Sequence, residues 1–184
     1  MKKFTLLSLA AALLLSVAVI PAHAGDSLTA GTTAPAFTLP SQDNTPISLS
    51  AYKGKWVVLY FYPKDFTGGC TLEAHNFQRD LDKYTAANAV VLGVSLDTAD
   101  SHKSFCTKES LSFKLLADPN HTVVDAYNVP VKTFNNPQTN APVTIAMRQT
   151  YLIDPTGKIV KFWDVKDIAN HSSEILAAIA AGGK

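Results

Sequence analysis

Two apolar runs of strand length, each followed by a helical pattern, most constrain the fold of this chain. Residues 56–62 and 89–96 are continuous stretches of β-branched, aromatic and other apolar side chains, as expected of strands buried on both faces. Residues 71–84 and 99–110 instead repeat apolar side chains at helical spacing. This alternation of strands and helices predicts an α/β fold with a mixed central sheet and helices on both faces.

The remainder of the chain predicts smaller elements and a closing helix. In chain order these are an extended piece at 37–39, a strand at 113–117, a short helix at 122–127, a loop at 130–142 and strands at 149–153 and 158–162. The loop is inferred from its three prolines and three asparagines. Residues 155–157 (PTG) indicate a hairpin between the last two strands. We expect a last helix over 166–181, ended by Gly182 and Gly183.

The first 24 residues have the pattern of a secretory signal peptide. Lys2 and Lys3 form a basic start, 4–20 is an apolar stretch, and 21–24 (PAHA) is a small-residue cleavage pattern. The apolar stretch is short for a membrane span, which needs about 20 residues. We therefore expect a signal peptide at 1–24 and one domain at 25–184, placed in the periplasm or otherwise exported.

Charge and composition exclude some partners of this domain. The chain has 16 Lys and Arg against 15 Asp and Glu, and removal of Lys2 and Lys3 would leave a net charge of about −1. We find no basic run and no basic patch interleaved with aromatic residues, so nucleic acid is not an expected partner. A second apolar segment of membrane-spanning length is also missing from the sequence, and we expect no membrane association after cleavage.

The two cysteines, Cys70 and Cys106, first suggest a structural disulfide in an exported protein. Cys70, however, lies where a buried strand has ended and a helix begins, a position that commonly binds ligands in α/β sheets. Lowering a thiol pKa from about 8.5 to about 6 requires roughly 3.4 kcal/mol. A helix N-terminus typically stabilises an anion by about 0.3–1 kcal/mol and at most by about 2 kcal/mol. A reactive thiolate here would need a cation or several aimed donors as well.

The residues around Cys70 resemble a known family. Residues 63–70 (PKDFTGGC) match the P-x-x-x-T-x-x-C signature of peroxiredoxins, and Arg148, which opens the predicted strand at 149–153, resembles the arginine that completes the family's site. The resemblance runs from about Ala34 to the last helix. The context YPKD before the cysteine and CTLEA from it looks most like the Q-type, or bacterioferritin comigratory protein-like, branch.

The resemblance implies a thioredoxin-like fold and a role for each site residue. Cys70 would attack the terminal oxygen of a hydroperoxide and become a sulfenic acid. Thr67 would hydrogen-bond both the sulfur and the peroxide, and Arg148 would stabilise the thiolate and the leaving oxygen. Pro63 would shield the sulfur from water. The implied partners are a hydroperoxide substrate and a thiol/disulfide reductant protein, with no metal or organic cofactor required and a monomeric protein.

Cys106 has three interpretations that the sequence leaves open. The helix at 99–110 carries His102, Phe105, Cys106 and Glu109 on one face, and some Q-type members resemble this chain in having a resolving cysteine on that helix. Cys106 would then form a cycling disulfide with Cys70, although a static disulfide or a small buried hydrophobe is also compatible with its position.

Two neighbours of Cys70 on its helix are less informative. His75 occupies the position where many Q-type members carry the resolving cysteine, and we expect it to have a surface or packing role. Glu73 either anchors the site loop or is an ordinary acidic residue in the first turn.

Two other functions share this fold class. A thioredoxin-like thiol-disulfide oxidoreductase usually carries C-x-x-C, whereas Cys70 is followed by Thr71, Leu72 and Glu73. A copper-delivery protein would need a second nearby cysteine and a later histidine at suitable spacing. The sequence disfavours both and favours a thiol-dependent peroxidase.

Overall fold

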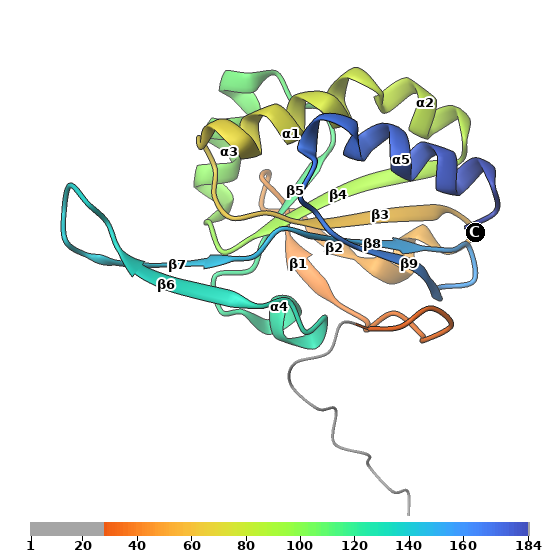
Figure 1. The fold of residues 1–184 in the computed structure, drawn as a ribbon, viewed down its shortest axis with the longest axis horizontal. Helices are drawn as coiled ribbons and strands as arrows, with labels where there is room; N and C mark the ends of the chain where they lie inside the picture. Colours follow the sequence, from red (N-terminus) through yellow and green to blue (C-terminus); the bar gives the residue numbers. More distant parts are fainter. Residues whose placement is uncertain (1–27, 184) are drawn as a thin grey trace, which may run out of the picture.

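The computed structural model describes residues 28–183, so the predicted signal peptide at 1–24 lies outside them. A five-stranded sheet forms the centre of the molecule, in the order β5-β4-β3-β8-β9 (Figure 1). Its strands are β3 (Trp56–Phe61), β4 (Ala89–Ser95), β5 (Lys114–Ala117), β8 (Gln149–Ile153) and β9 (Ile159–Asp164). β3, β4 and β5 are parallel, while β8 is antiparallel to both β3 and β9. The predicted mixed sheet is confirmed.

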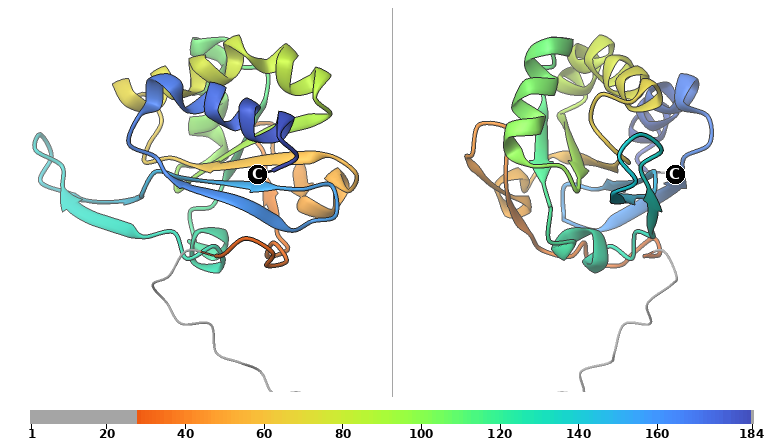
Figure 2. Two further views of the ribbon diagram at one scale, coloured as in Figure 1. Left: turned by 45° about the vertical axis from the view of Figure 1, so that its right-hand side comes forward. Right: turned by 90° about the vertical axis from the view of Figure 1, so that its left-hand side faces the viewer.

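Helices cover both faces of this sheet, unequally (Figures 1 and 2). One face carries α1 (Gly68–Arg79), α2 (Leu81–Ala86), α3 (Ala99–Glu109) and α5 (Ile168–Ala180). The other carries α4 (Thr122–Ala126) and the 3-10 helix η1 (Leu49–Tyr52), together with β1 (Thr38–Pro40) and β2 (Pro46–Ser48). Alternate β3 side chains point into the two resulting core layers, with Tyr60 in one and Phe61 in the other.

The predicted helix at 71–84 is two helices in the structure, and it begins earlier than expected. α1 starts at Gly68, so Cys70 lies in its first turn, and the chain leaves helical geometry at Asp80 before α2. The buried Asp80 carboxylate accepts hydrogen bonds from Arg79, Lys83 and Ser172 of α5. These bonds hold the junction against α5, which explains a break that apolar spacing alone does not indicate.

The predicted loop at 130–142 is wrong, because most of it belongs to a hairpin. β6 (Val131–Asn135) pairs with β7 (Pro142–Ala146) in an antiparallel arm that projects from the body (Figures 1 and 2). Two of its prolines stand at strand ends, where a missing N–H is tolerated. Asn136 lies in the turn, where its side chain accepts from the N–H groups of Gln138 and Thr139. The residues that suggested a loop are therefore those that begin, end and turn the arm.

The other predicted elements are close to those observed. The hairpin between β8 and β9 turns through Gly157 at φ 87°, and α5 ends just before Gly182 and Gly183, both at positive φ. Ile175 and Ile179 of α5 are buried in the core. Within residues 28–183 we find no helix that is both long and apolar enough to cross a bilayer.

A substitution at Gly93 of β4 tests how tightly this core is packed. A Cβ at this position would lie 2.6 Å from both Tyr60 Cζ and Leu115 Cδ2, closer than packed atoms tolerate. We expect Gly93→Ala to lower the free energy of unfolding by about 1–3 kcal/mol through overpacking. Urea denaturation followed by tryptophan fluorescence measures this change. Gly68→Ala is the matched control, because a Cβ there meets no atom within 4 Å; equal stability of the two variants would contradict this account of the core.

Candidate active site

Cys70 lies at the start of α1, just beyond the end of β3. Its side chain is buried, with 2% of its surface exposed. The N–H of Thr71 donates to the carbonyl of Thr67 at 2.9 Å, so the N–H groups of Gly68, Gly69 and Cys70 precede the hydrogen-bonded part of the helix. These N–H groups and the positive end of the helix dipole favour an anion at this point. The sulfur therefore occupies the helix start that the sequence predicts.

Arg148 reaches this sulfur from the beginning of β8. Its Nη2 donates to Cys70 Sγ at 3.1 Å, and its Nη1 donates to Glu73 Oε2. The forked guanidinium thus binds two side chains of α1 that are one helical turn apart. The predicted convergence of Cys70 and Arg148 is present in the structure. Glu73, whose role the sequence left open, is the carboxylate that fixes the guanidinium.

The Glu73–Arg148 pair is almost fully removed from solvent. Burial raises the pKa of Glu73 to about 7, against the opposing effect of the Arg148 charge. Its second oxygen, Oε1, has no hydrogen-bond partner among residues 28–183. Because the folded-state pKa lies above the ordinary value of 4.5, protonated Glu73 stabilises the fold at low pH, and this contribution is lost as the pH rises through about 7.

The two remaining signature residues, Thr67 and Pro63, precede Cys70 in the chain. Thr67 is the N-cap residue of α1, and its hydroxyl donates to the carbonyl of Lys64 at 3.0 Å, which closes the loop between β3 and α1. Pro63 is half-buried and follows the end of β3 by two residues. The contact of Thr67 with sulfur and peroxide, and the shielding by Pro63, remain predictions from the family resemblance.

A buried polar cluster that sequence reasoning missed ties this loop to α3. The carboxylate of Asp65 accepts from the Tyr62 hydroxyl at 2.7 Å and from the Ser101 hydroxyl at 2.7 Å, and it lies 2.9 Å from His102 Nδ1. The N–H of Asp65 donates to Asp97 at 2.9 Å. Burial raises the pKa of Asp65, but the bonds from His102, Ser101 and Tyr62 outweigh it and leave the pKa lowered.

A signal for this cluster is present in the sequence. Ser101 and His102 stand near the start of a helix, and Asp65 lies inside the signature that leads to Cys70. A histidine on the same helical face as Phe105 and Cys106 needs a polar partner once it is buried. The partner itself is 37 residues away in the chain, and spacing alone does not identify it.

Cys106 lies on α3, in the same hydrophobic cluster as Cys70, and both residues are free thiols. Burial, followed by the charges of Asp65 and Asp43, raises the pKa of Cys106 to about 12. A shallow cavity of about 330 Å³, bordered by Lys103, Lys114 and others, adjoins it. The two cysteines therefore share one core layer but have opposite electrostatic surroundings.

His75 and a second buried histidine complete the surroundings of the site. His75 is about half exposed and pairs with Glu109 of α3 at 3.1 Å, as expected of a surface residue. His171 of α5, which the sequence did not single out, contacts the Thr150 hydroxyl at 2.8 Å. Burial and the nearby Arg148 charge lower the pKa of His171 to about 4, so it is neutral beside the guanidinium.

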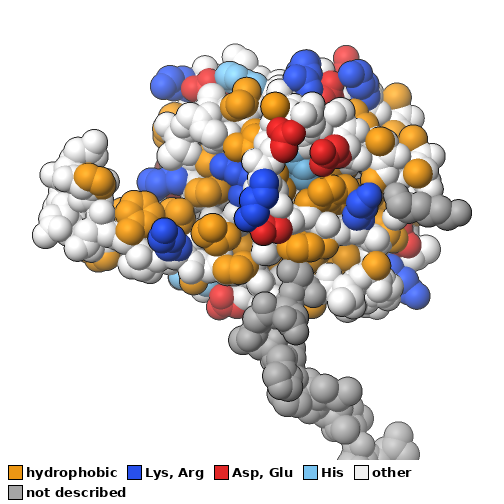
Figure 3. Space-filling model, in the orientation of Figure 1, with side chains coloured by type: hydrophobic (Ala, Val, Ile, Leu, Met, Phe, Trp, Pro, Cys, Tyr) orange, Lys and Arg blue, Asp and Glu red, His pale blue; other side chains and the backbone are white. Residues whose placement is uncertain are grey.

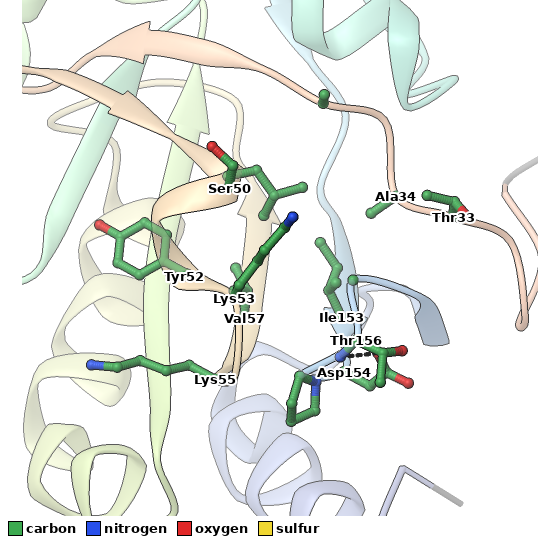
Figure 4. Close-up of a pocket in the computed structure, with 14 residues that line it drawn as sticks. Thr33, Ala34, Ser50, Tyr52, Lys53, Lys55, Val57, Ile153, Asp154 and Thr156 are labelled. Carbon is green, nitrogen blue, oxygen red and sulfur yellow. Dashed lines mark hydrogen bonds between the residues drawn. The ribbon is translucent and has the colours of Figure 1, made fainter.

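A separate pocket of about 290 Å³ lies at the opposite end of β3. Figure 4 shows it between η1, the segment around Thr33 and Ala34, and the turn that follows Ile153. β8 runs antiparallel to β3, with Ile153 paired to Val57 and Gln149 paired to Phe61. The pocket therefore adjoins the start of β3, whereas Cys70 and Arg148 lie beyond its end. It is not part of the cysteine site.

Comparison with known proteins agrees with this geometry. Residues 30–162 match the model of the AhpC/TSA family. The chain is 42% identical over 132 residues to the chloroplastic peroxiredoxin Q of Sedum lineare, covering 72% of this chain and 67% of that protein. It is 38% identical over 140 residues to peroxiredoxin Bcp of Xanthomonas campestris, covering 76% of this chain and 86% of that protein.

Solved structures give the same relationship. A structure of Xanthomonas campestris peroxiredoxin Q superposes with a TM-score of 0.71 at 38% identity, covering 80% of this chain and 92% of that one. The fold, the cysteine at the helix start and these similarities together establish that the chain belongs to the AhpC/TSA family, as a thiol-dependent peroxidase of the peroxiredoxin Q/Bcp branch.

Proposed function

We propose that Cys70 is the thiolate that reduces the hydroperoxide. Its sulfur attacks the terminal peroxide oxygen, the O–O bond breaks, and water or an alcohol leaves while Cys70 becomes a sulfenic acid. The observation that carries this assignment is the 3.1 Å hydrogen bond from Arg148 to the sulfur at a helix start. A guanidinium in this position stabilises the thiolate before attack and the charge on the leaving oxygen during it.

Thr67 and Pro63 have supporting roles in the proposed reaction. The Thr67 hydroxyl stands three residues before Cys70 at the helix N-cap, where it can align the peroxide with the sulfur. Pro63 is the half-buried residue at the exit from β3, where it limits the access of water. Both side chains restrict the path by which a peroxide reaches the Cys70 sulfur, so that it arrives beside Arg148 and the start of α1.

Cys106 is the proposed resolving thiol. It attacks the sulfenic acid of Cys70, which releases water and forms an intramolecular disulfide, and a thiol/disulfide reductant protein then reduces the pair. Both sulfurs belong to one hydrophobic cluster, but their helices are separate. A disulfide requires the sulfurs to come within about 2 Å, so the start of α1 must rearrange. We further propose that the protein carries out this cycle as a monomer.

Replacement of each cysteine by serine separates the two steps. We expect Cys70→Ser to abolish the stoichiometric burst of peroxide consumption by the reduced protein, because serine is not ionised at neutral pH. Cys106→Ser should keep the burst and stop at the sulfenic acid, which a dimedone adduct detects by mass spectrometry. Stopped-flow tryptophan fluorescence follows both variants. A normal burst from Cys70→Ser would contradict the assignment of the attacking sulfur.

We also propose that organic hydroperoxides are substrates. Within residues 28–183, the exposed large apolar side chains, with 40–50% of their surface exposed, are Phe66, Leu72, Val131, Phe134 and Met147. Phe66 and Leu72 flank Cys70 in the chain, and Met147 directly precedes Arg148. Val131 and Phe134 belong to the hairpin arm, whose second strand ends at Ala146, just before Met147. Figure 3 shows hydrophobic side chains along this arm and on the adjoining body. A related Xanthomonas campestris protein, 36% identical, is described by its alkyl peroxide reduction activity.

Met147 provides the test of this substrate range. It is 40% exposed and directly precedes Arg148. We expect Met147→Ser to slow the reaction with cumene hydroperoxide about fivefold, equivalent to about 1 kcal/mol of lost apolar contact, and to leave the rate with hydrogen peroxide unchanged. Lys132→Ser, which replaces a polar residue of the hairpin arm, is the control and should leave both rates unchanged. Equal slowing with both peroxides would show that Met147 supports the site and does not select the substrate.

We propose that the enzyme is exported to the periplasm by the signal peptide at 1–24. Expression of the full chain in a Gram-negative host should yield a periplasmic protein whose mass corresponds to a start at Gly25. Ala22→Leu places a bulky residue in the small-residue cleavage pattern and should slow the removal of 1–24. Intact-mass measurement of the fractions checks both outcomes. A full-length product confined to the cytosol would contradict the proposal.

A further inference from the structure

The proposed resolving step requires that Cys106 lose its thiol proton, and the surroundings of Cys106 disfavour that loss. Only a thiolate attacks a sulfenic acid at a useful rate, and burial raises the pKa of Cys106 to about 12. The Lys114 charge has the opposite effect on this thiol, but its amine pairs with Asp43 at 2.7 Å. Some other group must take the proton when Cys106 reacts.

His102 lies one helical turn before Cys106, on the same face of α3. Side chains four residues apart on a helix are neighbours, with Cβ atoms about 5–6 Å apart. His102 has no exposed surface, and its Nε2 has no hydrogen-bond partner among residues 28–183. Leaving a buried ring nitrogen without a partner is destabilising, so a purely structural role does not explain why a histidine occupies this position.

The hydrogen bonds of Nδ1, on the other edge of the imidazole, determine whether Nε2 can accept a proton. Nδ1 lies 2.9 Å from Asp65 Oδ2 and 3.2 Å from the Tyr62 hydroxyl, which itself donates to Asp65 Oδ1. An Nδ1–H that donates to the carboxylate places the lone pair of the neutral ring on Nε2. Asp97, which accepts from the Asp65 N–H and from Lys64, is the next charged group in the cluster. A carboxylate that orients an imidazole in this way is the usual arrangement of a general base.

We propose that His102 is the general base of the resolving step, an inference that rests on the proposed role of Cys106. As the Cys70 sulfenic acid approaches, His102 Nε2 accepts the Cys106 proton and the freed electron pair forms the S–S bond to Cys70. The S–O bond of the sulfenic acid breaks, and its oxygen leaves as water after taking up that proton. Cys106 sulfur is oxidised and Cys70 sulfur is reduced by one electron each, so the step needs no further reactant.

Asp65 gives this arrangement a second consequence. It belongs to the loop that leads into Cys70, five residues before the sulfur, and it holds the base on α3. The same hydrogen bond that orients His102 therefore keeps the Cys70 loop beside the helix that carries Cys106. Phe66 of this loop reinforces the contact, with its ring 5.1 Å from that of Phe105.

Two variants separate the base from the structural link. Asparagine places an amide N–H where Nδ1 donates to Asp65 but has no equivalent of Nε2, so His102→Asn keeps the link and removes the base. Ser101→Ala removes another hydrogen bond to the same carboxylate oxygen, which Ser101 donates at 2.7 Å, and keeps the base. Stopped-flow tryptophan fluorescence after one equivalent of hydrogen peroxide gives oxidation as a first phase and disulfide formation as a second.

We expect His102→Asn to slow the second phase at pH 7 about 100-fold or more, the usual contribution of a general base. Its remaining rate should rise about tenfold per pH unit from pH 6 to 9, because hydroxide must then remove the proton, whereas the wild-type rate should rise less steeply because His102 takes that proton. Ser101→Ala should retain the wild-type pH profile. The first phase in the same traces shows whether the Cys70 loop is intact.

Three outcomes overturn the proposal. A wild-type pH profile in His102→Asn would exclude the base while leaving Cys106 as the resolving thiol. Equal slowing of both phases in His102→Asn, reproduced by Ser101→Ala, would make His102 a structural link only. If wild-type protein forms no Cys70–Cys106 disulfide by mass spectrometry, the base and the resolving role of Cys106 fail together.

Discussion

The hydrogen bond from Arg148 to Cys70 is the interaction on which the proposed chemistry of this protein depends. A cation in a nearly dry site stabilises a nearby thiolate far more than it would in water, and a helix start alone is too weak for this purpose. The guanidinium is itself costly to bury. Glu73 offsets that cost through the second edge of the fork, and the raised pKa of Glu73 shows that the carboxylate bears part of the desolvation.

The sheet brings Arg148 to the sulfur although 78 residues separate them. β8 pairs antiparallel with β3, so the residue before β8 lies level with the end of β3, where the chain turns into α1. α1 is then fixed against α5, where the Asn76 side-chain amide donates to the Ile168 carbonyl at 3.1 Å. A shift of β8 by one residue would turn its side chains to the other face of the sheet, and the register thus positions the cation.

The sequence alone was sufficient to predict those parts of the fold and the site that depend on local patterns. Buried strands have a distinct composition, so their positions could be predicted. The cysteine site could be predicted because its signature at 63–70 is local, and Arg148 is the single distant residue that the signature requires. The break at Asp80, the hairpin arm at 131–146 and the Asp65–His102 contact were not foreseen. Each depends on a contact between segments that are far apart in the chain, as when the Ser172 hydroxyl donates to the Asp80 carboxylate. Prolines and asparagines that end strands also look like loop residues when their partner strand is unknown.

The two cysteines lie in one core layer but have different electrostatic surroundings. Cys70 meets a guanidinium and a helix start, whereas Cys106 meets apolar side chains and the charges of Asp65 and Asp43, which raise its pKa to about 12. A protonated, buried Cys106 does not compete for peroxide, which supports the proposal that peroxide oxidises Cys70 first. The proposed resolution by Cys106 then requires both movement of the α1 start and removal of a proton on α3. Asp65 belongs to the loop of one cysteine, and its carboxylate contacts the helix of the other. Both requirements therefore involve this one residue.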